Sequence, residues 1–147
     1  MGQVQLRPYQ NSCVKHVLDA RTDGRDRLLI VLPTGCGKTE IIAHLAARSA
    51  GRVLLVAHRV EILDQSAAKI AVADTAGDAC RIGYVFRRRN EWNRPYVLAS
   101  VPSLVRKLKR IPRDAFELLI IDEAHHAAAP LPIEAIRTDL RGPWGID

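Results

Sequence analysis

Cysteine is scarce in this sequence, and the few cysteines form no recognisable pattern. They are Cys13, Cys36 and Cys80, which lie far apart and include no Cys-x-x-Cys pair. Zinc sites and small disulfide-linked domains use cysteines in close pairs or in even numbers. The sequence therefore indicates neither a zinc site nor a disulfide framework.

Long hydrophobic runs are also missing. The chain is 48% hydrophobic overall, an ordinary globular value, yet no run approaches the roughly 20 apolar residues that cross a membrane. Met1-Gly2-Gln3 leads into polar sequence rather than into the apolar region of a secretion signal. We therefore expect a cytoplasmic protein, and 147 residues suit one domain with a single core.

Positive charge is concentrated in one part of the chain. Residues 81–113 contain ten basic residues and one acidic residue, whereas the other 114 contain twelve basic and fifteen acidic residues. A basic segment of this kind is typical of contacts with nucleic-acid phosphates. The alternative is a solvated surface in an arginine-rich chain, with 17 Arg against 5 Lys. We predict nucleic-acid contacts from Arg87, Arg88 and Arg89.

Apolar and helical patterns alternate along the chain. They predict strands over residues 28–32, 53–57, 81–86, 96–101 and 117–122. They predict helices over residues 8 to about 23, 38–49, 60–70 and from about 103 to 112, with a basic loop from the third strand to residue 95. Such alternation favours an α/β fold with a parallel sheet and right-handed crossovers.

The first chemical motif lies between the predicted strand 28–32 and the helix that follows it. Its residues are Pro33, Thr34, Gly35, Cys36, Gly37, Lys38 and Thr39. At such a turn several backbone N–H groups converge, and the helix dipole adds positive potential. The motif therefore predicts a phosphate-binding loop in which Lys38 reaches the terminal phosphates and the Thr39 hydroxyl ligates Mg²⁺.

A second motif follows the last predicted strand, where Asp122 and Glu123 are adjacent. The carboxyl ends of parallel strands share one edge of a sheet, where ligands bind. Asp122 can therefore hold the Mg²⁺ that Thr39 touches, while Glu123 can orient and deprotonate an attacking water. The alternative is a helix start that favours acids, but the two motifs together indicate a nucleoside triphosphatase.

The segments PTGCGKT and DEAH resemble motifs I and II of superfamily 2 helicases, above all the branch with type III restriction subunits and excision-repair helicases. Three further segments resemble motifs of this family. Residues 6–10 resemble its adenine-reading motif, residues 56–65 resemble motif Ia, and residues 97–104 resemble a later strand and turn. The resemblance implies a three-layer RecA-like domain with a mostly parallel sheet.

The resemblance assigns the ATP site. It implies that residues 33–39 bind ATP with Mg²⁺, and that Arg7 and Gln10 read the adenine, since an amide offers both a donor and an acceptor. The residues that would carry catalysis are Lys38, Asp122 and Glu123. Arg7 and Gln10 could instead simply start a helix.

The resemblance also implies contacts with nucleic acid, DNA more than RNA. The matching residues are His58, Arg59 and Ser100, and His125 would couple the ATP site to motif III. His58 and Arg59 could instead be an ordinary pair at a strand end.

In this family ATP lies between two RecA-like domains, and the second domain supplies arginine fingers. We expect residues 1–147 to form only the first domain, without the strand of motif III, as an N-terminal part of a motor that couples ATP hydrolysis to unwinding or translocation. Two alternatives stay open: a non-catalytic remnant that binds nucleotide or nucleic acid, and one subunit of a split motor whose partner chain brings the second domain.

Overall fold

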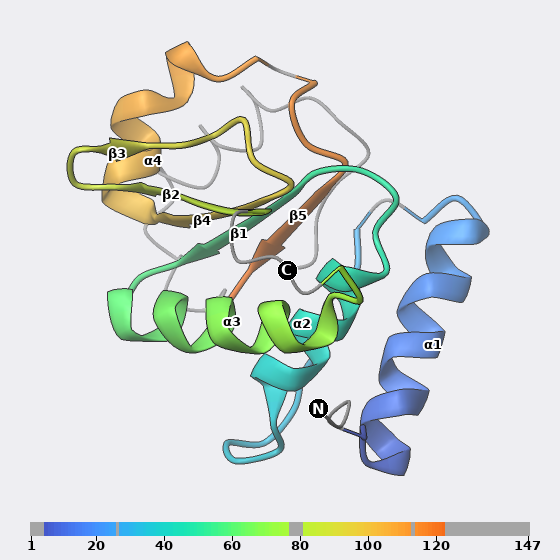
Figure 1. Cartoon of the computed structure of the whole chain (residues 1–147). Helices are drawn as coiled ribbons and strands as arrows, with labels where there is room; N and C mark the ends of the chain where they lie inside the picture. The colour runs from blue at the N-terminus through green and yellow to red at the C-terminus, as the bar shows by residue number, and fades with distance from the viewer. Residues whose placement is uncertain (1–4, 26, 77–80, 113, 123–147) are drawn as a thin grey trace.

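A five-stranded sheet forms the centre of the protein (Figure 1). The computed structural model describes residues 5–25, 27–76, 81–112 and 114–122. Within this part the strands run in the order β3-β2-β4-β1-β5. Their bounds are β1 Val53–Ala57, β2 Ile82–Phe86, β3 Arg89–Asn90, β4 Tyr96–Ser100 and β5 Leu118–Ile121. All neighbouring strands are parallel except β2 and β3, which are antiparallel.

Strands β1 and β4 are buried at every position, and apart from Ser100 their residues are apolar or aromatic. In β1, Leu55 packs into one hydrophobic cluster, while Leu54 and Val56 pack into a second. In β4, Leu98 and Val97 divide between the two clusters in the same way. Continuous apolar runs are typical of parallel strands that are covered on both sides.

Helices cover both faces of this sheet. The first cluster contains buried residues of α1 (Pro8–Thr22), α2 (Lys38–Ala47) and α3 (Val60–Ala73), and the second contains those of α4 (Val101–Lys107) and the 3-10 turn η2 (Leu108–Arg110). Figure 1 shows α1 outermost, beyond α2. Helix, sheet and helix form three layers, so the predicted α/β fold class is confirmed.

The parallel strands end at one common edge. Ala57 of β1 is paired with Ser100 of β4, Ala99 of β4 with Val85 of β2, and Val56 of β1 with Ile121 of β5. The segments that follow β1, β2, β4 and β5 therefore all leave the sheet at its carboxyl edge. This edge carries several of the predicted functional residues.

One predicted strand is wrong. Residues 28–32 form no strand of the described sheet; only Leu28 makes an isolated bridge. Leu28, Ile30 and Leu32 pack against the first cluster, whereas Leu29 is 66% exposed and Val31 is 80% exposed. An apolar run can thus pack against the core without becoming a strand of the described sheet, because a ladder also needs a neighbouring strand that offers its N–H and C=O groups.

The basic loop predicted after β2 is also different from the structure. Arg89 and Asn90 form β3, which pairs with Phe86 and Val85 of β2. The arginine run therefore lies on a tight hairpin at the edge of the sheet. The other predicted elements agree with the structure to within about three residues at each end, as boundary definitions allow.

Candidate nucleotide site and nucleic-acid edge

The glycine-containing loop leads directly into α2. The Cys36 N–H donates to the Pro33 carbonyl at 3.3 Å, which closes a turn, and Gly35 and Gly37 have φ angles of 84° and 69°. Gly37 is the N-cap of α2 and provides no side-chain cap. A helix start without a side-chain cap can offer its first N–H groups to an anion, where the helix dipole is also favourable.

Lys38 and Thr39 are the first two residues of α2, and both are half-buried. Their backbone N–H groups belong to the first turn of the helix, where N–H groups have no hydrogen-bond acceptor within the helix itself. The Lys38 ammonium provides a flexible positive charge at the same place, and the Thr39 hydroxyl provides a hard oxygen ligand. The loop and the helix start together can hold a polyphosphate chain.

Helix α1 supports this loop from one side. The Gln10 side chain is 4% exposed, and its Nε2 donates to the carbonyls of Cys36 at 3.1 Å and Gly37 at 3.4 Å. Its Oε1 accepts a hydrogen bond from the Arg7 N–H at 2.9 Å, and the Tyr9 hydroxyl donates to the Cys36 carbonyl at 2.9 Å. The segment predicted to read adenine is therefore in contact with the phosphate loop. Adenine recognition by Arg7 and Gln10 stays a prediction.

The Tyr9 contact was missed from the sequence because no residue pattern signals it. Its partner carbonyl belongs to Cys36, 27 positions away. A side-chain hydrogen bond to a distant backbone carbonyl depends on how α1 packs against α2, which local sequence does not specify.

Replacing Gln10 by Ala should destabilise the chain. The substitution removes a buried amide that bonds to the loop and to Arg7, and we expect the free energy of unfolding to fall by about 1–3 kcal/mol. Urea denaturation measures this, and Tyr9→Phe is the matched control because it removes one hydroxyl at a position that is 40% exposed. The control should cost less than about 1 kcal/mol. A Gln10→Ala chain as stable as wild type would show that the loop does not depend on this amide.

The same variant separates loop support from base reading. If Gln10 acts through the loop, Gln10→Ala should weaken binding of Mg²⁺-ADP and of inorganic tripolyphosphate, which has no base, by similar factors. If Gln10 acts only on the adenine, tripolyphosphate binding should stay unchanged.

Asp122 stands at the carboxyl edge of the sheet, immediately after β5. Its N–H donates to the Val56 carbonyl of β1 at 2.9 Å, and the residue is half-buried. The predicted Glu123 and His125 lie outside the described residues.

Coordination of Mg²⁺ by Thr39 and Asp122 stays a prediction. Within residues 5–25, 27–76, 81–112 and 114–122, no group of three or more His, Cys, Asp or Glu side chains could hold a metal ion. Mg²⁺ in nucleotide sites commonly uses one or two carboxylates together with substrate phosphates and waters. A hydroxyl from Thr39 and a carboxylate from Asp122 fit that pattern.

The residues predicted to touch nucleic acid lie along the same edge. His58 and Arg59 follow β1 directly and are exposed, whereas Ser100 at the end of β4 is 3% exposed. Ala57 and Ser100 are paired, so the two strand ends are level. The topology brings these residues to one edge, while their contact with nucleic acid stays a prediction.

The three arginines of the β2–β3 hairpin differ in their surroundings. The Arg87 guanidinium lies 4.9 Å from the centre of the Phe86 ring, and that of Arg89 lies 4.4 Å from the centre of the Tyr84 ring. Arg89 is also paired with Glu91 at 2.8 Å. Arg88 makes no hydrogen bond or ion pair with the part of the chain that the structure describes. The run of three identical side chains is therefore not a uniform charge patch.

The ring beneath Arg89 stays uncharged at neutral pH. Burial, the main cause, raises the pKa of Tyr84, and the carboxylates of Asp64 and Glu91 act in the same direction against the effect of Arg89. The stacking of Arg89 is thus a contact between a cation and a neutral aromatic face.

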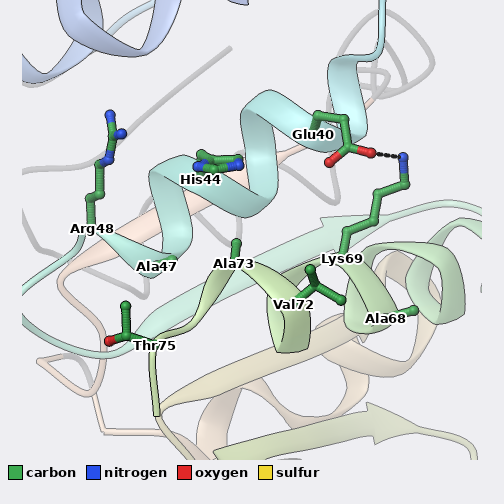
Figure 2. Close-up of a pocket in the computed structure, with 9 residues that line it drawn as sticks. All are labelled: Glu40, His44, Ala47, Arg48, Ala68, Lys69, Val72, Ala73 and Thr75. Atoms are coloured by element: carbon green, nitrogen blue, oxygen red, sulfur yellow. Dashed lines mark hydrogen bonds and ion pairs between the residues drawn. The ribbon is translucent and has the colours of Figure 1, made fainter. Parts of the chain in front are cut away.

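A groove between α2 and α3 runs along α2 from Glu40 to Arg48. Its volume is about 340 Å³, and Ala47, Ala68 and Ala73 are among the residues that line it. Figure 2 shows Glu40 of α2 and Lys69 of α3 pointing toward each other across it, and they form an ion pair. This pair connects the first turn of α2, next to the glycine-containing loop, to α3, whose first residues belong to the predicted motif Ia.

The family assignment comes from comparison with known sequences. The family model described as type III restriction enzyme, res subunit, matches residues 3–141. This chain belongs to that family. Membership confirms the resemblance to superfamily 2 helicases, because the match spans both the phosphate loop and the DEAH segment.

A relative in Schizosaccharomyces pombe bears the name of a mitochondrial ATP-dependent helicase. It is 32% identical over an alignment of 142 positions, which covers 86% of this chain and 22% of the relative. The chain thus spans about a fifth of the length of this relative.

Solved helicase structures share the fold. An ATP-dependent RNA helicase from Sulfolobus tokodaii, described as hypothetical, has a TM-score of 0.74 at 21% identity, covering 99% of this chain and 46% of that one. The UvsW helicase of bacteriophage T4 has a TM-score of 0.70 at 21% identity, covering 97% and 52%. The predicted RecA-like helicase fold is therefore confirmed.

Proposed function

We propose that this chain is the ATP-binding domain of a helicase-type motor and binds ATP with Mg²⁺. The observation that carries the proposal is the loop at the start of α2, where two glycines have positive φ and Lys38 begins the helix. Family membership supports it, as does the position of Asp122 at the carboxyl edge of β5.

Each residue has a role in the proposed hydrolysis of ATP to ADP and phosphate. Lys38 and the first N–H groups of α2 hold the terminal phosphates and offset the negative charge that develops there. Thr39 and Asp122 would hold Mg²⁺, which when bound neutralises phosphate charge. Glu123 would orient and deprotonate the attacking water.

The proposed motor is larger than this domain. The chain spans about a fifth of the curated relative described above, and coupling of ATP hydrolysis to unwinding or translocation is proposed for the complete protein. We propose that a second RecA-like domain, on the same chain or on a partner chain, closes the nucleotide site. A non-catalytic remnant is the second candidate, and ATP turnover by the complete protein distinguishes the two.

The proposed polymeric partner is nucleic acid. The names of the relatives include both a helicase without a stated substrate and an RNA helicase. Binding experiments with oligo(dT) and oligo(U) therefore compare DNA with RNA. No helix in the described part of the chain is long and apolar enough to cross a membrane. The cytoplasmic compartment expected from the sequence stays a prediction.

Calorimetry with Mg²⁺-ADP tests the central proposal. The 147-residue chain should bind one nucleotide with measurable heat, and inorganic tripolyphosphate should compete for the same site because the loop recognises phosphate. Absence of binding at millimolar nucleotide would contradict the assignment of the loop.

Replacing Arg87, Arg88 and Arg89 together by Ala should weaken nucleic-acid binding about tenfold on every sequence, since phosphate contacts carry no base information. Arg89 is already paired with Glu91. We therefore expect the slope of log K against log salt to flatten by the equivalent of two single-strand contacts, about 1.4 in total. Fluorescence anisotropy with oligo(dT) and oligo(U) measures both quantities. Unchanged affinity and slope would show that the hairpin is only a solvated surface.

A further inference from the structure

The arginine turn between β2 and β3 is held in place by α4. The Arg87 N–H donates to the Ser103 hydroxyl at 3.3 Å, and Ser103 is buried. The Lys107 ammonium donates to the carbonyls of Arg87 at 3.0 Å and Arg89 at 2.6 Å. Three backbone groups of the turn thus bond to one helix.

The turn needs this support because its backbone is strained. Arg87 has a φ of 51°, in the left-handed region that side chains with a Cβ rarely adopt. A hydrogen bond from a charged donor is stronger than a neutral one, and Lys107 makes two of them to carbonyls on either side of Arg88. Lys107 therefore stabilises a conformation that the turn would adopt poorly alone.

Two arginine side chains on the supported turn remain available for binding an anion. Arg89 is occupied by Glu91, whereas Arg88 is exposed and Arg87 lies over Phe86 without an ion pair in the described chain. Stacking on a ring restricts a guanidinium without neutralising it. Arg87 and Arg88 can therefore still bind phosphate.

The turn continues the row of strand ends at the carboxyl edge. Val85 is paired with Ala99, and Ala57 with Ser100, so the turn after β2 is nearly level with Arg59 after β1. Strands β1 and β2 are separated by β4, which places their ends two strand spacings apart, about 10 Å. This length covers about three nucleotides of a strand that keeps the stacking of a duplex, with a rise of about 3.4 Å per nucleotide, and fewer nucleotides of an extended strand.

We propose that Lys107 is a positioning residue that holds Arg87 and Arg88 in place for binding phosphate. The two arginines form a preformed corner, and this corner extends the contacts of Arg59 along a single nucleic-acid strand. This inference rests on the proposed binding of nucleic acid. It assigns Lys107 an indirect role, because two of its three N–H donors bond to backbone carbonyls.

Comparison of Lys107→Ala with Lys109→Ala tests the proposal. Each substitution removes one positive charge from neighbouring positions, but Lys109 is exposed and makes no hydrogen bond or ion pair with the described chain. Lys107→Ala should weaken oligo(dT) binding about fivefold and flatten the salt slope by about 1.4, because both arginines lose their position. Lys109→Ala should weaken binding less than twofold and change the slope by at most about 0.7. Mg²⁺-ADP affinity should be unchanged in both variants.

A double-mutant cycle separates positioning from direct contact. In a chain that already carries Arg87→Ala and Arg88→Ala, the further change Lys107→Ala should alter affinity by less than 1.5-fold, about 0.2 kcal/mol. A full fivefold loss in that background, or equal effects of Lys107→Ala and Lys109→Ala, would overturn the proposal.

Other outcomes are equally decisive. Oligo(U) in place of oligo(dT) should give the same pattern, because the corner recognises phosphate. Tighter binding of duplex than of single strands, with the same dependence on Lys107, would overturn the single-strand assignment. A chain that binds Mg²⁺-ADP but no oligonucleotide would overturn this inference and the proposed nucleic-acid partner, while the proposed ATP site would stand.

Discussion

A Lys38→Ala chain should bind Mg²⁺-ADP about 30- to 100-fold more weakly than wild type. Lys38 opens α2 directly after Gly37, where the helix dipole and the first N–H groups also favour phosphate. Hydrogen bonds between charged groups contribute about 1.5–3 kcal/mol, and the half-buried position of Lys38 limits screening by solvent. Calorimetry of both chains under identical salt measures the loss.

Cys36→Ala is the matched control for this prediction. Cys36 contacts α1 through its backbone carbonyl, which accepts from Tyr9 and Gln10, so its thiol can be replaced without removing these bonds. Nucleotide affinity should stay within twofold of wild type. Equal affinities of wild type and Lys38→Ala would mean that the loop is not the nucleotide site.

Gly37→Ala should damage both the loop and the stability of the chain. The φ of Gly37 is 69°, and a Cβ at this position would collide with Nε2 of Gln10. The left-handed backbone alone costs about 1–2 kcal/mol for a residue with a Cβ, and displacement of the buried amide adds to that cost. We expect a loss of about 2 kcal/mol or more in the free energy of unfolding and a loss of more than tenfold in Mg²⁺-ADP affinity.

Gly24→Ala separates backbone strain from the collision. Gly24 has a φ of 82°, but a Cβ there would meet no atom within 4 Å. Urea denaturation should show a loss of about 1–2 kcal/mol for Gly24→Ala, and calorimetry should show unchanged nucleotide affinity. If the two variants lose stability equally and both keep wild-type affinity, the contact between Gln10 and the loop has no role in nucleotide binding.

Local sequence was enough for most of the helices and strands. The helix predicted over residues 38–49 has the apolar residues Ile41, Ile42, Leu45 and Ala46 at helical spacing, and all four are buried on α2. Strands β1 and β4 were predicted from continuous apolar runs, and every residue in them is buried. These predictions succeeded because the periodicity of apolar side chains reflects which face of an element meets the core.

The candidate site was predicted from sequence only in part. The order of the motifs located the phosphate loop at a helix start and Asp122 at a strand end, since both positions follow from elements that are local in the chain. The contact of Gln10 with Cys36 and Gly37 joins residues 26 and 27 positions apart. That contact depends on how two helices pack, so no local pattern indicates it.

The sequence by itself determined the family, the α/β class, the position of the glycine-containing loop at a helix start and the excess of basic residues in one segment. Tertiary structure alone decided that residues 28–32 do not join the described sheet, that the arginines form a hairpin, and that Lys107 supports it from 18 to 20 positions away. The physical reason is the same in each case. Strand pairing and side-chain hydrogen bonds require partners that are distant in the chain, whereas burial and helix initiation depend mainly on neighbouring residues.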